Sequence, residues 1–167
     1  MTIEEADEAW MDRALALAEK AEALDEVPVG AVVVLDGMVV GEGFNQPISG
    51  HDPTAHAEVR ALRDAAQRLG NYRLTDATLY VTLEPCTMCA GALVHARIGT
   101  LVFGAREPKA GVIRSRAKIL EAEHLNWQIG VREAVRESQC RDQLTAFFAR
   151  RRAEKKKRRN DSEGEDE

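Results

Sequence analysis

The β-prone run from Val29 to Phe44, interrupted only by Asp36-Gly37, most constrains the fold of this chain. It predicts a β-hairpin, because an Asp-Gly pair accepts the positive φ of a tight two-residue turn. The segments around the hairpin alternate between helical periodicity and β-rich runs. Helices are predicted over residues 4–24, 54–69, 86–96 and from about 133, and further strands over 78–83, 100–103 and 126–131. This order indicates an α/β fold whose sheet is covered on both faces, and the hairpin makes the sheet mixed.

The length of 167 residues suits one domain with a short appendage. We expect the domain to span residues 1–152, including the C-terminal helix. Residues 153–167 then form a charged tail, basic and then acidic, that is partly disordered from Asn160. No apolar run reaches the roughly 18–20 residues of a membrane span, and the acidic start of the chain lacks a signal-peptide pattern. We therefore expect a cytoplasmic protein without a membrane partner.

The net charge of −5 hides an uneven distribution. Residues 150–159 hold eight bases and one acid, residues 160–167 hold five acids, and residues 1–149 hold 15 bases against 22 acids. A basic block of this density can neutralise several phosphates of a nucleic acid. The alternative is a solvated helix end or a disordered tail.

Two short motifs carry the chemistry, and each begins a predicted helix. They are His56-Ala57-Glu58 and Pro85-Cys86-Thr87-Met88-Cys89. A Cys-x-x-Cys pair places two thiolates one helical turn apart, so both can bind one tetrahedral Zn²⁺, with His56 as a third ligand. Three protein ligands leave one position open, which is typical of catalytic zinc, and Glu58 is close enough to move protons. Taken alone, the cysteine pair also suits a redox site or buried structural residues, but the two motifs together favour a zinc hydrolase.

The combination His-x-Glu and Pro-Cys-x-x-Cys is the signature of zinc-dependent nucleobase deaminases. The chain resembles one branch of this group, the bacterial tRNA-specific adenosine deaminases of the cytidine and deoxycytidylate deaminase superfamily. The segments that carry the resemblance are Val27–Ala31, Gly41–Asn45, His51–Glu58, Asn71–Leu74, Tyr80–Cys86, Met88–Gly91 and Phe103–Ala105. The resemblance implies a three-layer α/β/α cytidine-deaminase-like fold with five strands, one Zn²⁺ per subunit and a homodimer. It also implies hydrolytic conversion of adenosine to inosine at the wobble position of a tRNA anticodon.

The resemblance further implies roles for particular residues. His56, Cys86 and Cys89 hold zinc, Glu58 is the catalytic proton carrier, and Asn45 hydrogen-bonds the target nucleoside. Val29 corresponds to a pocket wall, and the Pro85 carbonyl is placed to accept from the exocyclic amine. For contact with the anticodon stem-loop, the candidates are Glu107, Phe148, Arg150, Arg151 and Arg152.

Two other functions remain open from the residues alone. The first is deamination of a free nucleobase or nucleoside of the guanine or cytosine type, which activity on free nucleosides but not on RNA would favour. The second is a non-catalytic RNA-binding module stabilised by zinc. Glu58 argues against the second, because a structural site more often fills its fourth position with another Cys or His.

Overall fold

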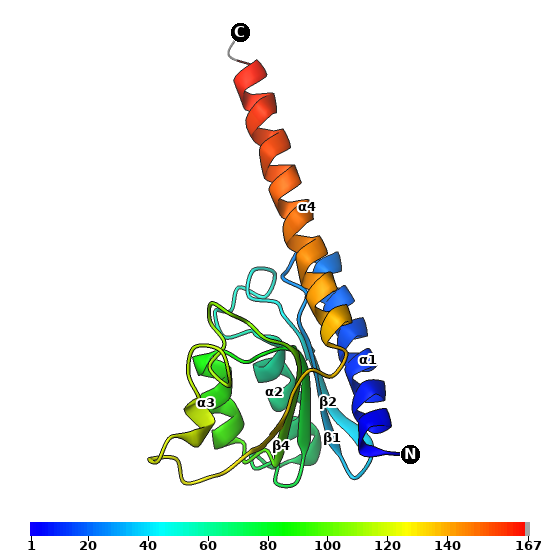
Figure 1. Cartoon of the computed structure of the whole chain (residues 1–167), viewed down its shortest axis with the longest axis vertical. Helices are drawn as coiled ribbons and strands as arrows, with labels where there is room; N and C mark the ends of the chain where they lie inside the picture. Colours follow the sequence, from blue (N-terminus) through cyan, green and yellow to red (C-terminus); the bar gives the residue numbers. More distant parts are fainter. Residues whose placement is uncertain (166–167) are drawn as a thin grey trace.

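The computed structural model describes residues 1–165, and Figure 1 shows a central sheet with helices on both faces. The strand order is β2-β1-β3-β4-β5, in which β1 is antiparallel to both neighbours and β3, β4 and β5 are parallel. The strands are β1 (Gly30–Leu35), β2 (Met38–Phe44), β3 (Thr78–Leu83), β4 (Thr100–Ala105) and β5 (Gly130–Arg132). The helices are α1 (Ile3–Ala23), α2 (Ala57–Leu69), α3 (Thr87–His95) and α4 (Glu137–Gly164), with a 3-10 turn η1 (Ile119–Glu121). The predicted mixed five-stranded α/β sheet is confirmed.

The sheet is buried on both faces because its strands send alternate side chains into two apolar layers. Ala31 and Val33 of β1 pack with residues of α2 and α3. Val32 and Val34 pack on the opposite face with α1 and with Cys140 of α4. Strands β3 and β4 alternate in the same way, so the β-rich runs read from the sequence are the centre of the fold.

Helix α2 lies unusually close to β2 because the strand has glycine where the helix passes. A Cβ added at Gly43 would lie 2.5 Å from the carbonyl oxygen of Ala57. Any side chain at Gly43 would therefore push the first turn of α2 away from the sheet. That turn follows His56 and carries Glu58, so the close approach positions two predicted site residues.

Three element boundaries differ from the sequence prediction. Helix α2 begins at Ala57 with His56 as its N-cap, whereas Thr54 forms a turn with Asp52. The last strand is shorter and lies later than residues 126–131. The helix expected from about residue 133 begins at Glu137, because the preceding segment contains left-handed backbone at φ values of 65° and 52° that interrupts the helical path.

Helix α4 is 28 residues long, and its C-terminal half projects beyond the body of the molecule (Figure 1). The structure continues helix α4 through Gly164, within the tail predicted to be partly disordered from Asn160, and residues 166–167 of that tail lie outside the described residues. Lys157 and Asp161, and Arg159 and Glu163, are four residues apart, a spacing at which opposite charges stabilise a helix. Among residues 1–165, no helix combines the length and apolar character needed to cross a bilayer.

Candidate metal centre and substrate site

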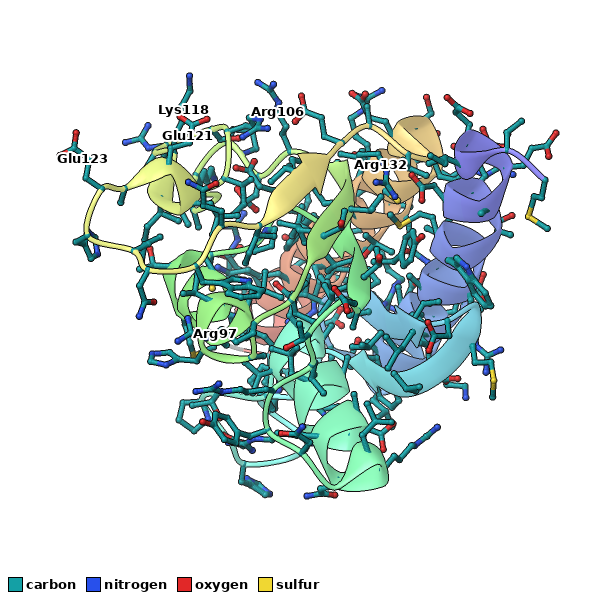
Figure 2. All side chains as sticks on the ribbon, turned by 90° about the horizontal axis from the view of Figure 1, so that it is seen from below. Arg97, Arg106, Lys118, Glu121, Glu123 and Arg132 are labelled. Atoms are coloured by element: carbon teal, nitrogen blue, oxygen red, sulfur yellow. The ribbon has the colours of Figure 1, made fainter. Side chains whose placement is uncertain are left out.

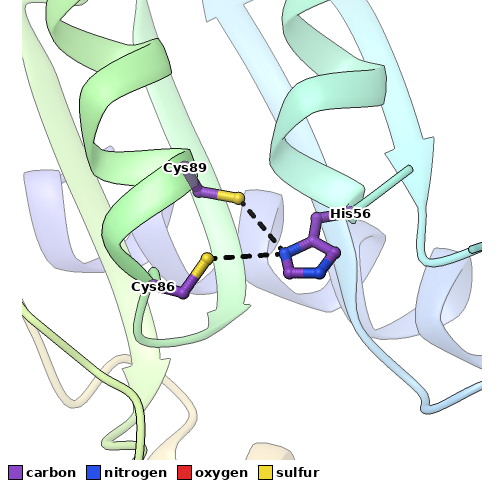
Figure 3. Close-up of side chains that lie close together, drawn as sticks. All are labelled: His56, Cys86 and Cys89. Carbon is purple, nitrogen blue, oxygen red and sulfur yellow. Dashed lines mark hydrogen bonds between the residues drawn. The ribbon is translucent and has the colours of Figure 1, made fainter. Parts of the chain in front are cut away.

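The side chains of His56, Cys86 and Cys89 converge on one point (Figure 3). The Nδ1 atom of His56 lies 3.5 Å from the Sγ atom of Cys86 and 3.5 Å from the Sγ atom of Cys89. All three candidate ligand atoms lie within 4.8 Å of one another. The predicted cluster of one histidine and two cysteines is therefore present in the structure, with its ligand atoms close enough to bind one metal ion.

This cluster fits a tetrahedral zinc ion. With Zn–S bonds of about 2.3 Å and Zn–N bonds of about 2.0 Å, tetrahedral angles separate the sulfur and nitrogen atoms by about 3.5 Å. The two observed Sγ–Nδ1 distances match that value. Two sulfurs and one imidazole nitrogen are ligands that zinc prefers, and three protein ligands leave the fourth position for water or substrate.

The local structure leaves the His56 and Cys86 side chains free of helix-capping hydrogen bonds and favours the thiolate form of Cys86. His56 and Cys86 occupy the N-cap positions of α2 and α3, and neither side chain caps its helix. The Cys89 thiol donates to Cys86, and His56 adds a second hydrogen bond, so the pKa of Cys86 falls to about 3 despite its partial burial. The N-terminal end of α3 favours negative charge at the same place. Cys86 is thus held in the ionised form that binds a metal.

Glu58 lies beside the cluster, in the first turn of α2, and only 4% of it is exposed. Burial raises the pKa of its carboxyl group, and the neighbouring Cys86 adds to the rise. A carboxyl group whose pKa is raised toward neutrality can both accept and donate a proton. The arrangement therefore combines a zinc site that has an open position with an adjacent acid–base group.

Comparison with known proteins gives the same result as the geometry. Residues 4–105, more than half of the chain, match the family described as the cytidine and deoxycytidylate deaminase zinc-binding region. The chain belongs to this deaminase family. The matched region contains His56, Glu58, Cys86 and Cys89, so the converging cluster is that family's zinc-binding site in this chain.

Similar proteins include several members with a known activity. A tRNA-specific adenosine deaminase of Haemophilus influenzae is 53% identical over 91% of this chain and 88% of its own length. A solved structure from work on A-to-I editing by tRNA:A34 deaminases is 43% identical, has a TM-score of 0.79 and covers 81% of this chain and 99% of its own. A guanine deaminase of Nitrosomonas europaea is more distant, at 25% identity and a TM-score of 0.71, covering 85% of this chain and 84% of its own.

The three residues predicted to contact the nucleoside lie in different environments. Asn45 directly follows β2 and is the first residue of the loop that leads to His56. Its backbone N–H donates to the Val29 carbonyl at 3.0 Å. Val29 is 8% exposed and packs in the α2–α3 side of the core. Pro85 is also buried, and its carbonyl accepts from the Val112 N–H at 3.1 Å, which leaves its second lone pair available.

The predicted RNA-contacting arginines have unlike roles in the structure. Arg150 pairs with Glu154 and with acidic residues at the end of α1, and Arg151 donates to the Asp25 carbonyl at 2.8 Å. Both guanidinium groups also stack on the buried Phe147 ring. These two residues therefore attach α4 to the end of α1, although Arg150 is exposed and only Arg151 is half-buried. Arg152 is exposed and forms no ion pair within residues 1–165.

The other two RNA candidates also differ from each other. Phe148 is 44% exposed and packs edge-on against Phe147, so one of the two adjacent rings is in the core and the other reaches solvent. Glu107 uses its side chain within its own loop, where it accepts from the Lys109 N–H at 2.8 Å. Its carboxylate therefore shapes the turn.

Two buried carboxylates near the site were missed by sequence reasoning. Glu26, which is 1% exposed, accepts from the backbone of Ile48 and from both the backbone and hydroxyl of Ser49, in the loop between Asn45 and His56. Glu84, which is 3% exposed, holds the loop after β4. The position of Glu84 directly before Pro85-Cys86 was the available signal, but its hydrogen-bond donors come from residues 23 to 31 positions later.

Proposed function

We propose that this protein is a zinc-dependent deaminase that converts adenosine to inosine at the wobble position of a tRNA anticodon. The observation that carries the proposal is the convergence of His56, Cys86 and Cys89 beside the buried Glu58. The chemical class follows from that geometry, and the choice of tRNA adenosine is supported by the 53% identical tRNA-specific adenosine deaminase.

In the proposed reaction, Glu58 moves every proton. When bound, Zn²⁺ lowers the pKa of a water molecule to about 7 and so supplies a nucleophile at neutral pH. Glu58 accepts a proton from the attacking water and delivers it to N1 of adenine while oxygen bonds to C6. It next takes the second proton from the oxygen now bonded to C6 and passes it to the exocyclic amine. The C6–N bond then breaks, ammonia leaves, and C6 keeps the oxygen as a carbonyl. The net change is addition of water and loss of ammonia, which gives inosine.

We propose that Asn45 and Pro85 orient the nucleoside. The Asn45 side chain lies in the loop that joins β2 to the zinc ligand His56 and can hydrogen-bond the target. The free lone pair of the Pro85 carbonyl can accept from the exocyclic amine, next to Cys86. Val29 supports the wall behind these groups from its place in the core.

The substrate in this proposal is an anticodon stem-loop, because a base inside a duplex cannot reach a buried metal site. We assign the phosphate contacts of α4 mainly to Arg152 and the exposed residues 155–159. Arg150 and Arg151 support them indirectly, since their guanidinium groups hold α4 on α1. Phe148 can stack on an unpaired base, and Glu107 shapes the loop that faces the RNA.

We further propose a homodimer in the cytoplasm, with one Zn²⁺ in each subunit. An apolar cavity of about 390 Å³ between α2 and α3 is a suitable contact face for a second copy. It is lined by Leu62, Ala66, Tyr72, Ala92 and Ala96, among others. Sedimentation velocity tests the dimer, and a monomer at micromolar concentration would contradict it.

The test of function incubates the purified protein with anticodon stem-loop RNAs that carry adenosine or cytidine at the wobble position. Inosine is read by mass spectrometry of the digested RNA, and zinc is measured in the same sample. Free adenosine, guanine and cytidine serve as comparison substrates. We expect inosine only from the adenosine RNA, whereas conversion of the cytidine RNA alone, or of free guanine alone, would contradict the assignment.

A further inference from the structure

The buried carboxylate of Glu84 collects an unusual number of donors. It accepts from the backbone N–H groups of Glu107, Ile113, Arg114 and Ser115 at 2.8–3.0 Å, and from the Ser115 hydroxyl. None of the ion pairs formed within residues 1–165 involves Glu84. Its charge is therefore balanced by backbone dipoles from a single loop, which orders that loop around one point.

This loop lies next to the zinc ligands. Strands β3 and β4 are parallel, with Leu83 paired to Ala105, so Cys86 and the loop after β4 leave the same edge of the sheet. The Val112 N–H donates to the Pro85 carbonyl, and Val112 itself is buried in the core. A Cβ added at Gly111 would collide with the Glu84 carboxyl group. The inward side of the loop is thus held tightly against residues 84–86.

The outward side of the same loop is strongly cationic. Residues 106–118 contain five bases and one acid, whereas the rest of residues 1–149 contains ten bases and 21 acids. Lys109, Arg116 and Lys118 are exposed, Arg114 is half-buried, and within residues 1–165 none of the four forms an ion pair. Arg106 differs, because it pairs with Glu133. Figure 2 shows Arg106 and Lys118 extending outward along one edge of the molecule.

We propose that Lys109, Arg114 and Arg116 form a second contact surface for the phosphates of the RNA substrate, and that Glu84 is the positioning residue that holds this surface beside the zinc site. The surface is separate from α4 and belongs to the catalytic body, whose charge is otherwise acidic. The inference rests on the proposed function, because the polyanion it binds is the RNA that enters the site. The two contacts would hold the stem-loop at two points, one on α4 and one next to Cys86.

The expected effect follows from counterion release. Each neutralised phosphate contributes about 0.7–0.9 to the slope of log affinity against log salt concentration. Removing three contacts should therefore lower the slope by about 2–3. When the salt concentration rises from 50 to 200 mM, the affinity of the wild-type surface for RNA should therefore fall about 20- to 40-fold more than the affinity of a variant that lacks the three residues.

The first experiment measures binding of a labelled anticodon stem-loop by fluorescence anisotropy from 50 to 200 mM KCl. The E58Q substitution blocks turnover in all samples. K109Q/R114Q/R116Q is compared with R13Q/K20Q/R68Q, which removes the same charge from α1 and α2. We expect a slope lower by about 2–3 for the loop variant only. An unchanged slope, or an equal fall in both variants, overturns the proposed surface.

The second experiment tests Glu84 itself. E84Q replaces one acceptor oxygen by an amide donor that faces backbone N–H groups, so it should release the loop from residue 84. The slope of log affinity against log salt concentration should then fall, and KM should rise more than kcat falls. Adding K109Q/R114Q/R116Q to E84Q should then change the slope little, whereas E84D should restore part of it. An E84Q protein with a wild-type slope overturns the positioning role.

Two further measurements keep the inference testable by itself. If E84Q does not fold, S115A removes one of the five donors and should shift the slope in the same direction by less; no shift overturns the positioning role. Inosine formation by the wild-type protein is scored separately on the same RNA. Absence of inosine with normal binding contradicts the proposed function, whereas inosine with an unaltered slope in the loop variant contradicts only this inference.

Discussion

Glu58→Gln should separate catalysis from zinc binding and from stability. Gln is isosteric, so the first turn of α2 and its N-cap His56 stay in place and the zinc content should remain one ion per chain. The amide cannot carry protons between water, N1 and the leaving amine. General acid–base catalysis contributes about 10²–10⁴-fold, so kcat should fall by that factor, which is about 2.7–5.5 kcal/mol at 1.36 kcal/mol per tenfold change.

The same substitution should not destabilise the fold. Burial raises the pKa of Glu58, which means that its ionised form is disfavoured in the folded state. A carboxyl group of this kind costs stability as the pH rises from its unfolded pKa through its folded pKa, and a neutral amide removes that cost. The Tm of zinc-free E58Q near pH 7 should therefore equal or exceed that of the zinc-free wild type.

The assay is single-turnover inosine formation from the adenosine stem-loop, with thermal unfolding and a zinc determination on the same preparation. Glu123→Gln, at an exposed residue outside the site, is the matched control and should keep full activity. Turnover of E58Q within a few-fold of the wild type would refute the assigned role of Glu58. A loss of zinc along with the activity would instead assign Glu58 to the metal site.

Four further results are expected. Chelation of zinc should lower the Tm, and added zinc should restore it; at free zinc 100 times its Kd the stabilisation is about 2.7 kcal/mol. Arg132→Ala should cost about 1.5–3 kcal/mol in urea denaturation, because it removes two hydrogen bonds from the buried Asp7, whereas Arg106→Ala, at a more exposed pair, should cost under about 1 kcal/mol. Burial raises the pKa of Cys140 to about 12, so this thiol should stay protonated and resist alkylation at pH 8 until the protein unfolds, as mass spectrometry can show. Deleting residues 160–167 removes five acids next to the basic block and should strengthen RNA binding at low salt; equal affinity would mean that the acids do not compete for it.

The layout of the fold could be predicted because its signals are local. The Asp36-Gly37 turn and the β-prone runs on either side of it each depend on a few adjacent residues. Boundaries were less accurate where a tertiary constraint acts. Helix α4 starts only at Glu137 because the backbone at Ala134 and Arg136 is left-handed, which is incompatible with a right-handed helix. No short-range sequence pattern predicts that conformation.

The chemistry of the site was readable because its residues occur in two compact motifs. His56 and Glu58 are two positions apart, and Cys86 and Cys89 are three, spacings that a helix start converts into proximity. The substrate and RNA contacts were less accessible. Arg150 and Arg151 look like free cations in the sequence. In the structure Arg150 pairs with the Asp25 carboxylate and Arg151 donates to the Asp25 carbonyl, at the end of α1 and more than 120 positions away.

The sequence by itself determined the order of elements and the zinc ligands, and it predicted Glu58 as the acid–base group, because periodicity and short motifs act over a few residues. Only the tertiary structure decided which charges are free and which are already used. Glu84 reads as an ordinary residue at a strand end, but parallel pairing of β3 with β4 brings the N–H groups of residues 107 and 113–115 onto its carboxylate. The availability of a charged group depends on neighbours distant in the chain, and only folding brings those neighbours together.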